Sequence, residues 1–150
     1  MKRGKFRNAI FAVTYKIENE KIIYLLLKRK LHWKGWEFPK GGIKFLELKK
    51  QTVKREIKEE TNLKIISIKK FNIKGKYLYQ KKLKDRPNFV GQKYYLYVVK
   101  VKNGEIKFDK IEHSNYEWMD FNKAIKILTW DNQKQCLKKV NDYLKNAKKN

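Results

Sequence analysis

Three glutamates of one short segment fall on the same side of a predicted helix. The segment Leu48–Thr61 lacks glycine and proline and is rich in helix formers, and Asn62 can end it in the left-handed conformation. At about 100° per residue, Glu56, Glu59 and Glu60 share one face, where like charges four residues apart destabilise a helix. A divalent cation would resolve this repulsion, because hard ions such as Mg²⁺ take carboxylate oxygens. The spacing alone is equally compatible with a solvated face on which lysines offset the acids.

The surroundings of this segment favour the metal interpretation. The chain has only 15 acidic residues, yet Glu47 adds a fourth within 14 residues of sequence. The turn Pro39-Lys40-Gly41-Gly42 directly precedes the acidic segment, and its glycines let the backbone approach a ligand closely. A carbonyl oxygen of this turn can therefore supply a neutral ligand to the same cation.

Taken together, these residues resemble the Nudix box. Gly41, five residues, Glu47 and seven residues are followed by Arg55-Glu56-Ile57-Lys58-Glu59-Glu60-Thr61-Asn62-Leu63, which matches seven of the eight defining positions at the family's spacing. Asn62 replaces the last glycine of the box, and Leu46 stands where members often place a glycine before the first glutamate. Asn also visits the left-handed region, so the first departure is physically mild.

The resemblance implies a hydrolase that cuts a nucleoside diphosphate linked to another group, with Mg²⁺ or Mn²⁺ held by the box. The implied metal ligands are three carboxylates and one backbone carbonyl: Glu56, Glu59, Glu60 and Lys40 or Gly41. Arg55 would orient carboxylates by pairing with Glu47. Water would attack a phosphorus of the polyphosphate chain while the cation neutralises charge on the phosphate oxygens.

A general base must then remove the proton of the attacking water. Glu56 is the candidate within the box, and Glu112 is the candidate on a later loop, where it is also a candidate metal ligand. The stretch Glu112-His113-Ser114-Asn115-Tyr116-Glu117-Trp118 resembles one in diadenosine tetraphosphate hydrolases and RNA 5′-pyrophosphohydrolases. Glu112 as an ordinary surface acid stays an alternative, and we expect a structural role for His113.

The stretch Trp36–Gly42 resembles the lead-in to the box in those same two subfamilies. In the diadenosine tetraphosphate hydrolases, an adenine is held between aromatic rings, and position implies Tyr94 and Tyr143 for that clamp, with half-buried packing as the alternative. The remaining candidate substrate contacts are one further tyrosine and three cations: Tyr77, Lys40, Lys81 and Arg86. The stretch Gly91-Gln92-Lys93-Tyr94-Tyr95 resembles one in bacterial RNA pyrophosphohydrolases, so an RNA 5′ end stays open as the substrate.

The elements that must position these residues follow from the apolar pattern. We expect strands at residues 6–15, 22–30, 64–74, 77–81, 93–101 and 116–119, with loops at 32–47 and 82–92. Asp120 and Asp131 are candidate caps for helices over 122–128 and to about Ala147, the last with Leu137, Val140 and Leu144 inward. The order implies an α+β or α/β fold in one domain, residues 1–150. The resemblance implies an α/β/α sandwich with a mixed sheet and helices on both faces.

Composition limits the remaining possibilities. The formal charge of +24 attracts polyanions, although lysines spread along the whole chain are also typical of a biased genome. One cysteine excludes an internal disulfide and a cysteine-based zinc site. No apolar run approaches the ~18 residues of a membrane span and we see no signal peptide, so we expect a cytoplasmic protein without membrane partners. A non-catalytic nucleic-acid-binding module is the alternative class, and the clustered glutamates argue against it.

Overall fold

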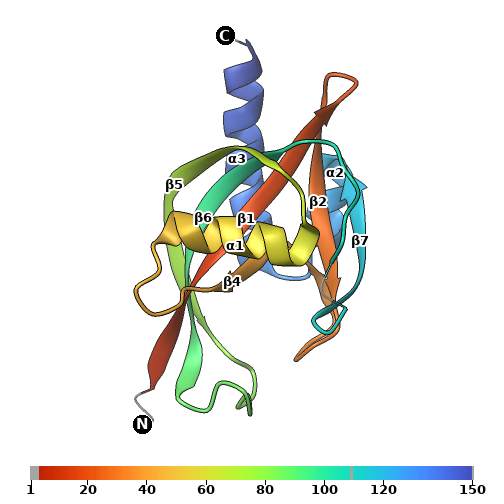
Figure 1. Cartoon of the computed structure of the whole chain (residues 1–150). Coiled ribbons are helices and arrows are strands. Elements are labelled where there is room, and N and C mark those ends of the chain that lie inside the picture. The colour runs from red at the N-terminus through yellow and green to blue at the C-terminus, as the bar shows by residue number, and fades with distance from the viewer. Residues whose placement is uncertain (1–3, 109, 150) are drawn as a thin grey trace.

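A mixed β-sheet lies between helices on both of its faces (Figure 1). The computed structural model describes residues 4–108 and 110–149. The strands are β1 Lys5–Glu18, β2 Lys21–Arg29, β3 Gly35–Glu37, β4 Lys40–Gly42, β5 Ile65–Leu78, β6 Phe89–Val101 and β7 His113–Met119. The helices are α1 Lys49–Thr61, α2 Phe121–Ile127 and α3 Asp131–Lys149. The expected sandwich is confirmed.

Strand β1 lies at the centre of the sheet, and both of its faces are covered. The strands run in the order β3-β2-β1-β6-β5; β4 also pairs with β1 and β7 with β2. The pair β1–β6 is parallel and the other pairs are antiparallel. Residues 9–15 of β1 are all buried, as expected for a strand packed on two sides. Alternate residues of β1 therefore belong to two separate cores.

Helix α1 covers one face of the sheet. Its Val53 and Ile57 are fully buried against Ile10 and Ala12 of β1. Asn62 ends the helix at φ 58°, and its backbone N–H donates to the carbonyls of Ile57 and Lys58, at 3.1 and 3.0 Å. The prediction that Asn62 ends this helix in the left-handed conformation is confirmed.

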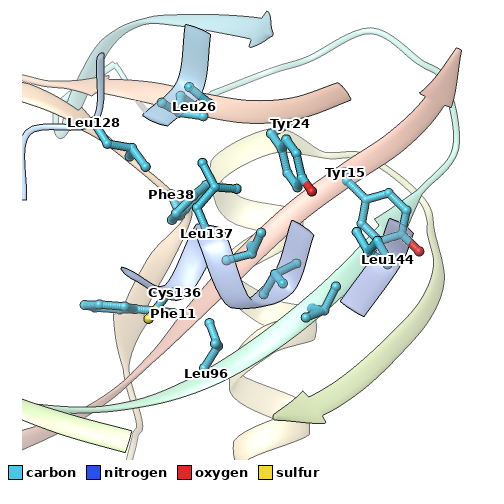
Figure 2. Packing of buried hydrophobic residues seen from close by; sticks show 14 of the residues in the cluster. Phe11, Tyr15, Tyr24, Leu26, Phe38, Leu96, Leu128, Cys136, Leu137 and Leu144 are labelled. Atoms are coloured by element: carbon cyan, nitrogen blue, oxygen red, sulfur yellow. The ribbon is translucent and has the colours of Figure 1, made fainter. Parts of the chain in front are cut away.

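Helices α2 and α3 cover the opposite face. Figure 2 shows Leu144 of α3 beside Tyr15 of β1 and Leu137 of α3 beside Phe38, in the core beneath this helix. Leu137, Val140 and Leu144 are buried, so the predicted inner face of the last helix is confirmed. Asp120 caps α2 by accepting the backbone N–H of Lys123 at 2.9 Å, also as predicted. None of the helices described is long and apolar enough to cross a membrane.

Several strand boundaries differ from the prediction. The predicted loop 32–47 contains β3 and β4, whose three residues each are too few to show a period. The first predicted run, 64–74, and the start of the second, 77–81, belong to one strand, β5, which ends at Leu78 and has a register irregularity between Lys70 and Lys74. Strands β6 and β7 begin at Phe89 and His113, earlier than predicted, because pairing with β5 and β2 extends both strands toward their N-terminal ends.

Candidate active site

Strand β4 brings backbone against the acidic face of α1. Gly41 pairs with Ile10 of β1, on the side of the sheet that α1 covers. A Cβ at Gly41 would meet the side chain of Glu56, so the carboxylate could keep this position only beside a glycine and would otherwise have to shift. The structure therefore places the turn predicted to supply a carbonyl ligand next to a predicted carboxylate ligand.

Arg55 holds the carboxylates of Glu47 and Glu56 in place. Its Nε and Nη2 donate to the two carboxylate oxygens of Glu47 at 2.8 and 2.9 Å, and Nη2 also donates to the Gly42 carbonyl at 2.8 Å. Its Nη1 donates to Glu56 Oε1 at 2.6 Å. The hydrogen bonds from Arg55 are the largest cause that lowers the pKa of Glu47 to about 2. The guanidinium thus has the orienting position expected for Arg55.

The loop that carries Glu47 adopts the conformation a glycine would favour. Leu46 has φ 61° and is 86% exposed. Glu47 nevertheless stays in place, because it also accepts from the Thr52 hydroxyl at 2.6 Å and from the backbone N–H of Lys44 at 3.1 Å. The departure from the family pattern at Leu46 therefore introduces local backbone strain and leaves the position of Glu47 intact.

Glu60 is a buried carboxylate without a hydrogen-bond partner. The residue is 2% exposed, and neither of its carboxylate oxygens meets a donor among the described residues. Burial raises the pKa of Glu60 well above its usual value, and the carboxylates of Glu56, Glu37 and Glu112 raise it further. Burial also raises the pKa of Glu56, although Arg55 opposes that effect. Such a group is costly unless a cation accompanies it.

A possible cation position lies between α1 and the start of β7. One carboxylate oxygen each of Glu60 and Glu112 and one ring nitrogen of His113 lie within 4.8 Å of one another. The unpartnered oxygens of Glu60 fit a divalent cation, which would supply the missing charge. Glu59 is exposed and lies at the rim, 3.3 Å from Arg55 Nη1. The structure thus gathers Glu56, Glu60 and Glu112 and leaves Glu59 facing solvent.

Glu37 is the charged residue at this site that the sequence did not reveal. It is 1% exposed; its Oε2 contacts Arg29 Nη1 and His113 Nε2, both at 3.1 Å. Its Oε1 accepts from Trp33 Nε1 at 3.3 Å and lies 3.6 Å from Lys40 Nζ. Despite burial, these partners lower its pKa to about 2, Lys40 contributing most. An acid between two aromatic residues was the only sequence signal, and one of its partners, His113, is 76 residues away in the chain.

His113 is oriented by this carboxylate. Because an ionised carboxylate only accepts, Nε2 carries the proton in the neutral imidazole that bonds to Glu37. The other ring nitrogen, Nδ1, is buried and has no partner among the described residues. The Nη1 of Arg29 lies 3.9 Å from Glu112 Oε2, so the same buried network also reaches Glu112. His113 has the structural contact expected for it, next to the possible cation position.

A cleft of about 570 Å³ opens on the other side of Glu37. Its aromatic lining residues are Phe11, Trp33, Tyr77, Tyr79 and Trp130. Lys40, Tyr77 and Lys81, all predicted substrate contacts, line this cleft. Burial lowers the pKa of Lys40 to about 8, against the opposing effect of Glu37. Arg86 lies beside the cleft, where it donates to the Tyr79 hydroxyl at 3.1 Å.

The structure does not bring Tyr94 and Tyr143 together as a clamp. Tyr94 is 8% exposed and stacks on Phe11, with 4.2 Å between ring centroids, because its side chain faces the core beneath α3. Tyr143 is half-exposed and contacts Phe71 and Lys69 instead of the cleft. The expected pairing of these two rings is therefore corrected: the aromatic side chains at the cleft come from other positions.

Comparison with known proteins agrees with this geometry. The NUDIX domain family matches residues 5–140. The chain belongs to the NUDIX family. Nudix hydrolases use divalent metals, and the acidic cluster fits such an ion.

Among NUDIX proteins, an RNA pyrophosphohydrolase from Ruthia magnifica subsp. Calyptogena magnifica is 31% identical over 116 residues. The match covers 70% of this chain and 64% of that protein, so the chain spans less than two thirds of that relative's length. The Ap4A hydrolase of C. elegans is 26% identical, with a TM-score of 0.71 over 93% of this chain and 98% of that one. A NUDIX hydrolase structure from Listeria monocytogenes has a TM-score of 0.78 at 22% identity over 95% and 96%.

Proposed function

We propose that this Nudix hydrolase is a cytoplasmic enzyme that cleaves dinucleoside polyphosphates, converting diadenosine tetraphosphate to ATP and AMP with Mg²⁺ or Mn²⁺. One observation carries the proposal: Glu37 connects an aromatic cleft that fits a nucleoside to the acidic cluster that fits a cation. Its carboxylate lies 3.6 Å from Lys40 Nζ at the cleft and 3.1 Å from His113 Nε2 beside the cluster. The similarity to an Ap4A hydrolase over nearly the whole chain supports the same substrate.

Each group then has a role that follows from its position. The carboxylates of Glu56, Glu60 and Glu112, with Glu59 at the rim and the Gly41 carbonyl, would hold the divalent cation. When bound, that cation neutralises phosphate charge and acidifies a bound water. The buried ammonium of Lys40 faces the cleft and offers a positive charge to the phosphate chain.

The proton of the attacking water needs an acceptor. Glu56 and Glu112 are the two candidates for this general base. Glu56 is held by Arg55 at 2.6 Å, which disfavours protonation, whereas Glu112 is a partly exposed residue. Both remain within the proposed mechanism, and the pH profiles of Glu56→Gln and Glu112→Gln separate them: the base variant loses the acidic limb of the kcat profile.

Removal of phosphates from an RNA 5′ end is the second candidate function. The 31% identical relative is an RNA pyrophosphohydrolase, and a charge of +24 favours a long polyanion. The chemistry is the same in both cases, since each reaction cuts a 5′-polyphosphate next to a nucleoside. The two functions therefore differ in what occupies the space beyond the cleft.

One comparison tests the proposal. Purified protein is incubated with Mg²⁺ or Mn²⁺ and either diadenosine tetraphosphate or 5′-triphosphorylated RNA, and kcat/KM is measured for each. We expect ATP and AMP from the dinucleotide, with the higher kcat/KM. A higher value for RNA, with release of pyrophosphate or stepwise phosphate, would select the second function.

Variants of the acidic cluster test whether the same site is responsible. Glu59→Gln and Glu60→Gln should each lower kcat by about 100-fold or more while the far-ultraviolet circular dichroism is unchanged. Glu105→Gln, which changes an exposed acid away from the site, is the matched control. Activity in both site variants equal to the parent would exclude this cluster, and binding of nucleic acid without turnover would indicate a non-catalytic module.

A further inference from the structure

A row of lysines follows one flank of α1. Lys50, Lys54 and Lys58 recur every four residues, and all three are exposed. Lys54 and Lys58 each lie two residues from Glu56, about 160° around the helix, so the row is on the other side of α1 from the acidic cluster. Like charges at this spacing destabilise a helix. Among the described residues the ion pairs of α1 all involve Arg55, so no acid offsets the row.

The row borders two surface hollows that share Lys50. One hollow lies between α1 and the start of β5, and the other lies at the start of α1. Glu47 is the one acid among the described residues that line them, and Arg55 already holds it at 2.8 Å. The lysines that line the two hollows, called the lysine surface below, are Lys44, Lys49, Lys50, Lys54, Lys58 and Lys64. The two hollows therefore form one continuous basic surface.

An exposed aromatic ring lies at one end of the lysine surface. Phe45, in the loop between β4 and α1, is 92% exposed and lines the second hollow. Its ring contacts no other aromatic ring in the part of the chain that the structure describes. Leu46 and Leu48 beside it are exposed as well. Large apolar side chains gathered in water mark interaction sites, because their exposure contributes nothing to the core.

A single-stranded nucleic acid matches both features. From Lys50 to Lys58 the row is about 12 Å long, which spans about three to four phosphates at the ~3.4 Å rise of one strand. An unpaired base can stack on Phe45, because every base has a π-face. A duplex keeps its bases stacked inside and offers Phe45 no such face. RNA is the abundant single strand in a cell, whereas cellular DNA is double-stranded.

We propose that the lysine surface and Phe45 bind single-stranded RNA at a place separate from the acidic cluster. The lysines contact the phosphates along α1, and the ring of Phe45 stacks on a base at one end. This inference goes beyond the proposed function, because such binding requires neither a cation nor a 5′-polyphosphate. A general excess of lysine would attract RNA everywhere on the protein, so the test must compare this surface with another.

Salt dependence tests the lysines. A 12-nucleotide oligouridylate with a 5′-hydroxyl and a 3′-fluorescein is titrated with the protein in EDTA, and fluorescence anisotropy gives Kd between 50 and 200 mM KCl. Changing Lys50, Lys54 and Lys58 together to glutamine should flatten the slope of log K against log[salt] by about 2, at about 0.7 for each lost phosphate contact. Binding at 0.1 M KCl should weaken about tenfold or more.

The matched control removes the same charge elsewhere. Lys138, Lys139 and Lys145 are exposed on α3, on the opposite face of the sheet, and their joint change to glutamine should leave the slope and Kd close to those of the parent. An equal loss in both triple variants would show that net charge alone attracts RNA and would overturn the inference. An unchanged slope in the α1 variant, or no binding by the parent, would overturn it too.

Variants of Phe45 test the stacking. Phe45→Ala should weaken binding about tenfold without changing the salt slope, whereas Phe45→Tyr keeps the π-face and should bind like the parent. Tighter binding of a duplex or of the equivalent DNA strand would overturn single-stranded RNA as the occupant. A dimer in sedimentation velocity that Phe45→Ala dissociates would assign the loop to self-association instead. Because the strand has no 5′-polyphosphate and EDTA removes metal, failure here leaves the proposed reaction standing, and failure of the reaction leaves this binding standing.

Discussion

Replacing Glu60 by glutamine should stabilise the metal-free protein and remove its response to metal. The carboxylate is 2% exposed and unpartnered, and the nearest charges that act on it are other carboxylates. An uncompensated buried charge costs about 3 kcal/mol. The amide that replaces it still leaves polar atoms unsatisfied, at about 1 kcal/mol. We therefore expect Glu60→Gln to gain about 2 kcal/mol at pH 8 in EDTA.

The sign of the pH dependence follows from the raised pKa of Glu60. A carboxyl group that is harder to ionise when folded gives its full stability below the unfolded pKa, near the ordinary value of 4.5. That stability is lost as pH rises from there through the higher folded pKa of Glu60. The metal-free parent should thus become less stable between pH 5 and pH 8, and Glu60→Gln should show less of this decline. The gap between the two proteins should be small at pH 5.

Adding Mn²⁺ should reverse the order of stability. Ligand binding to the folded state stabilises by about 2.7 kcal/mol at one hundred times its Kd. The parent should gain that amount and Glu60→Gln should gain little. Urea unfolding followed by tryptophan fluorescence, with EDTA or MnCl₂ at pH 5 and pH 8, measures all of these differences. A variant that is less stable than the parent in EDTA at pH 8, or that gains as much from Mn²⁺, would refute the reasoning; Glu105→Gln is the control.

Three further substitutions test single contacts. Leu46→Gly relieves a left-handed backbone and should raise stability by about 0.5–1 kcal/mol, a Tm increase of ~1–4 °C. An unchanged Tm would contradict the strain. Arg55→Lys keeps the charge but cannot span both oxygens of Glu47, so urea unfolding should show a loss of about 1–2 kcal/mol. Glu37→Gln leaves buried cations such as Lys40 without their counter-charge and should cost about 3 kcal/mol by the same measurement; a loss below ~0.5 kcal/mol would show that the network is not needed for stability.

The local part of the site was predictable because its spacing is fixed by one helix. Glu56 and Glu60 lie about one turn apart on α1, so their shared face follows from helical geometry, with Glu59 at its edge. The pairing of Arg55 with Glu47 spans eight residues and was implied by the resemblance to the Nudix box. Where a short segment determines the geometry, the residue pattern is sufficient.

The long-range part was not predictable because its contacts join distant segments. Glu37 bonds to His113, 76 residues away, and the aromatic rings of Trp33 and Trp130 meet edge to face at 6.1 Å. Whether Tyr94 could contact the substrate depended on which face of the sheet its side chain occupies. Tyr94 pairs with Ala9 of β1 and faces the core beneath α3, which a single sequence does not specify.

The register of β4 explains how the cleft and the acidic cluster adjoin. Lys40 pairs with Phe11, and both line the cleft; Gly41 pairs with Ile10 on the side of α1 and lies against Glu56. Consecutive residues of a strand point to opposite faces, so this short strand contributes a cation to the cleft and backbone to the cluster. A shift of one residue in this pairing would exchange the two faces. The spacing between lysine and glycine in this turn is therefore as necessary to the site as the glutamates of the helix.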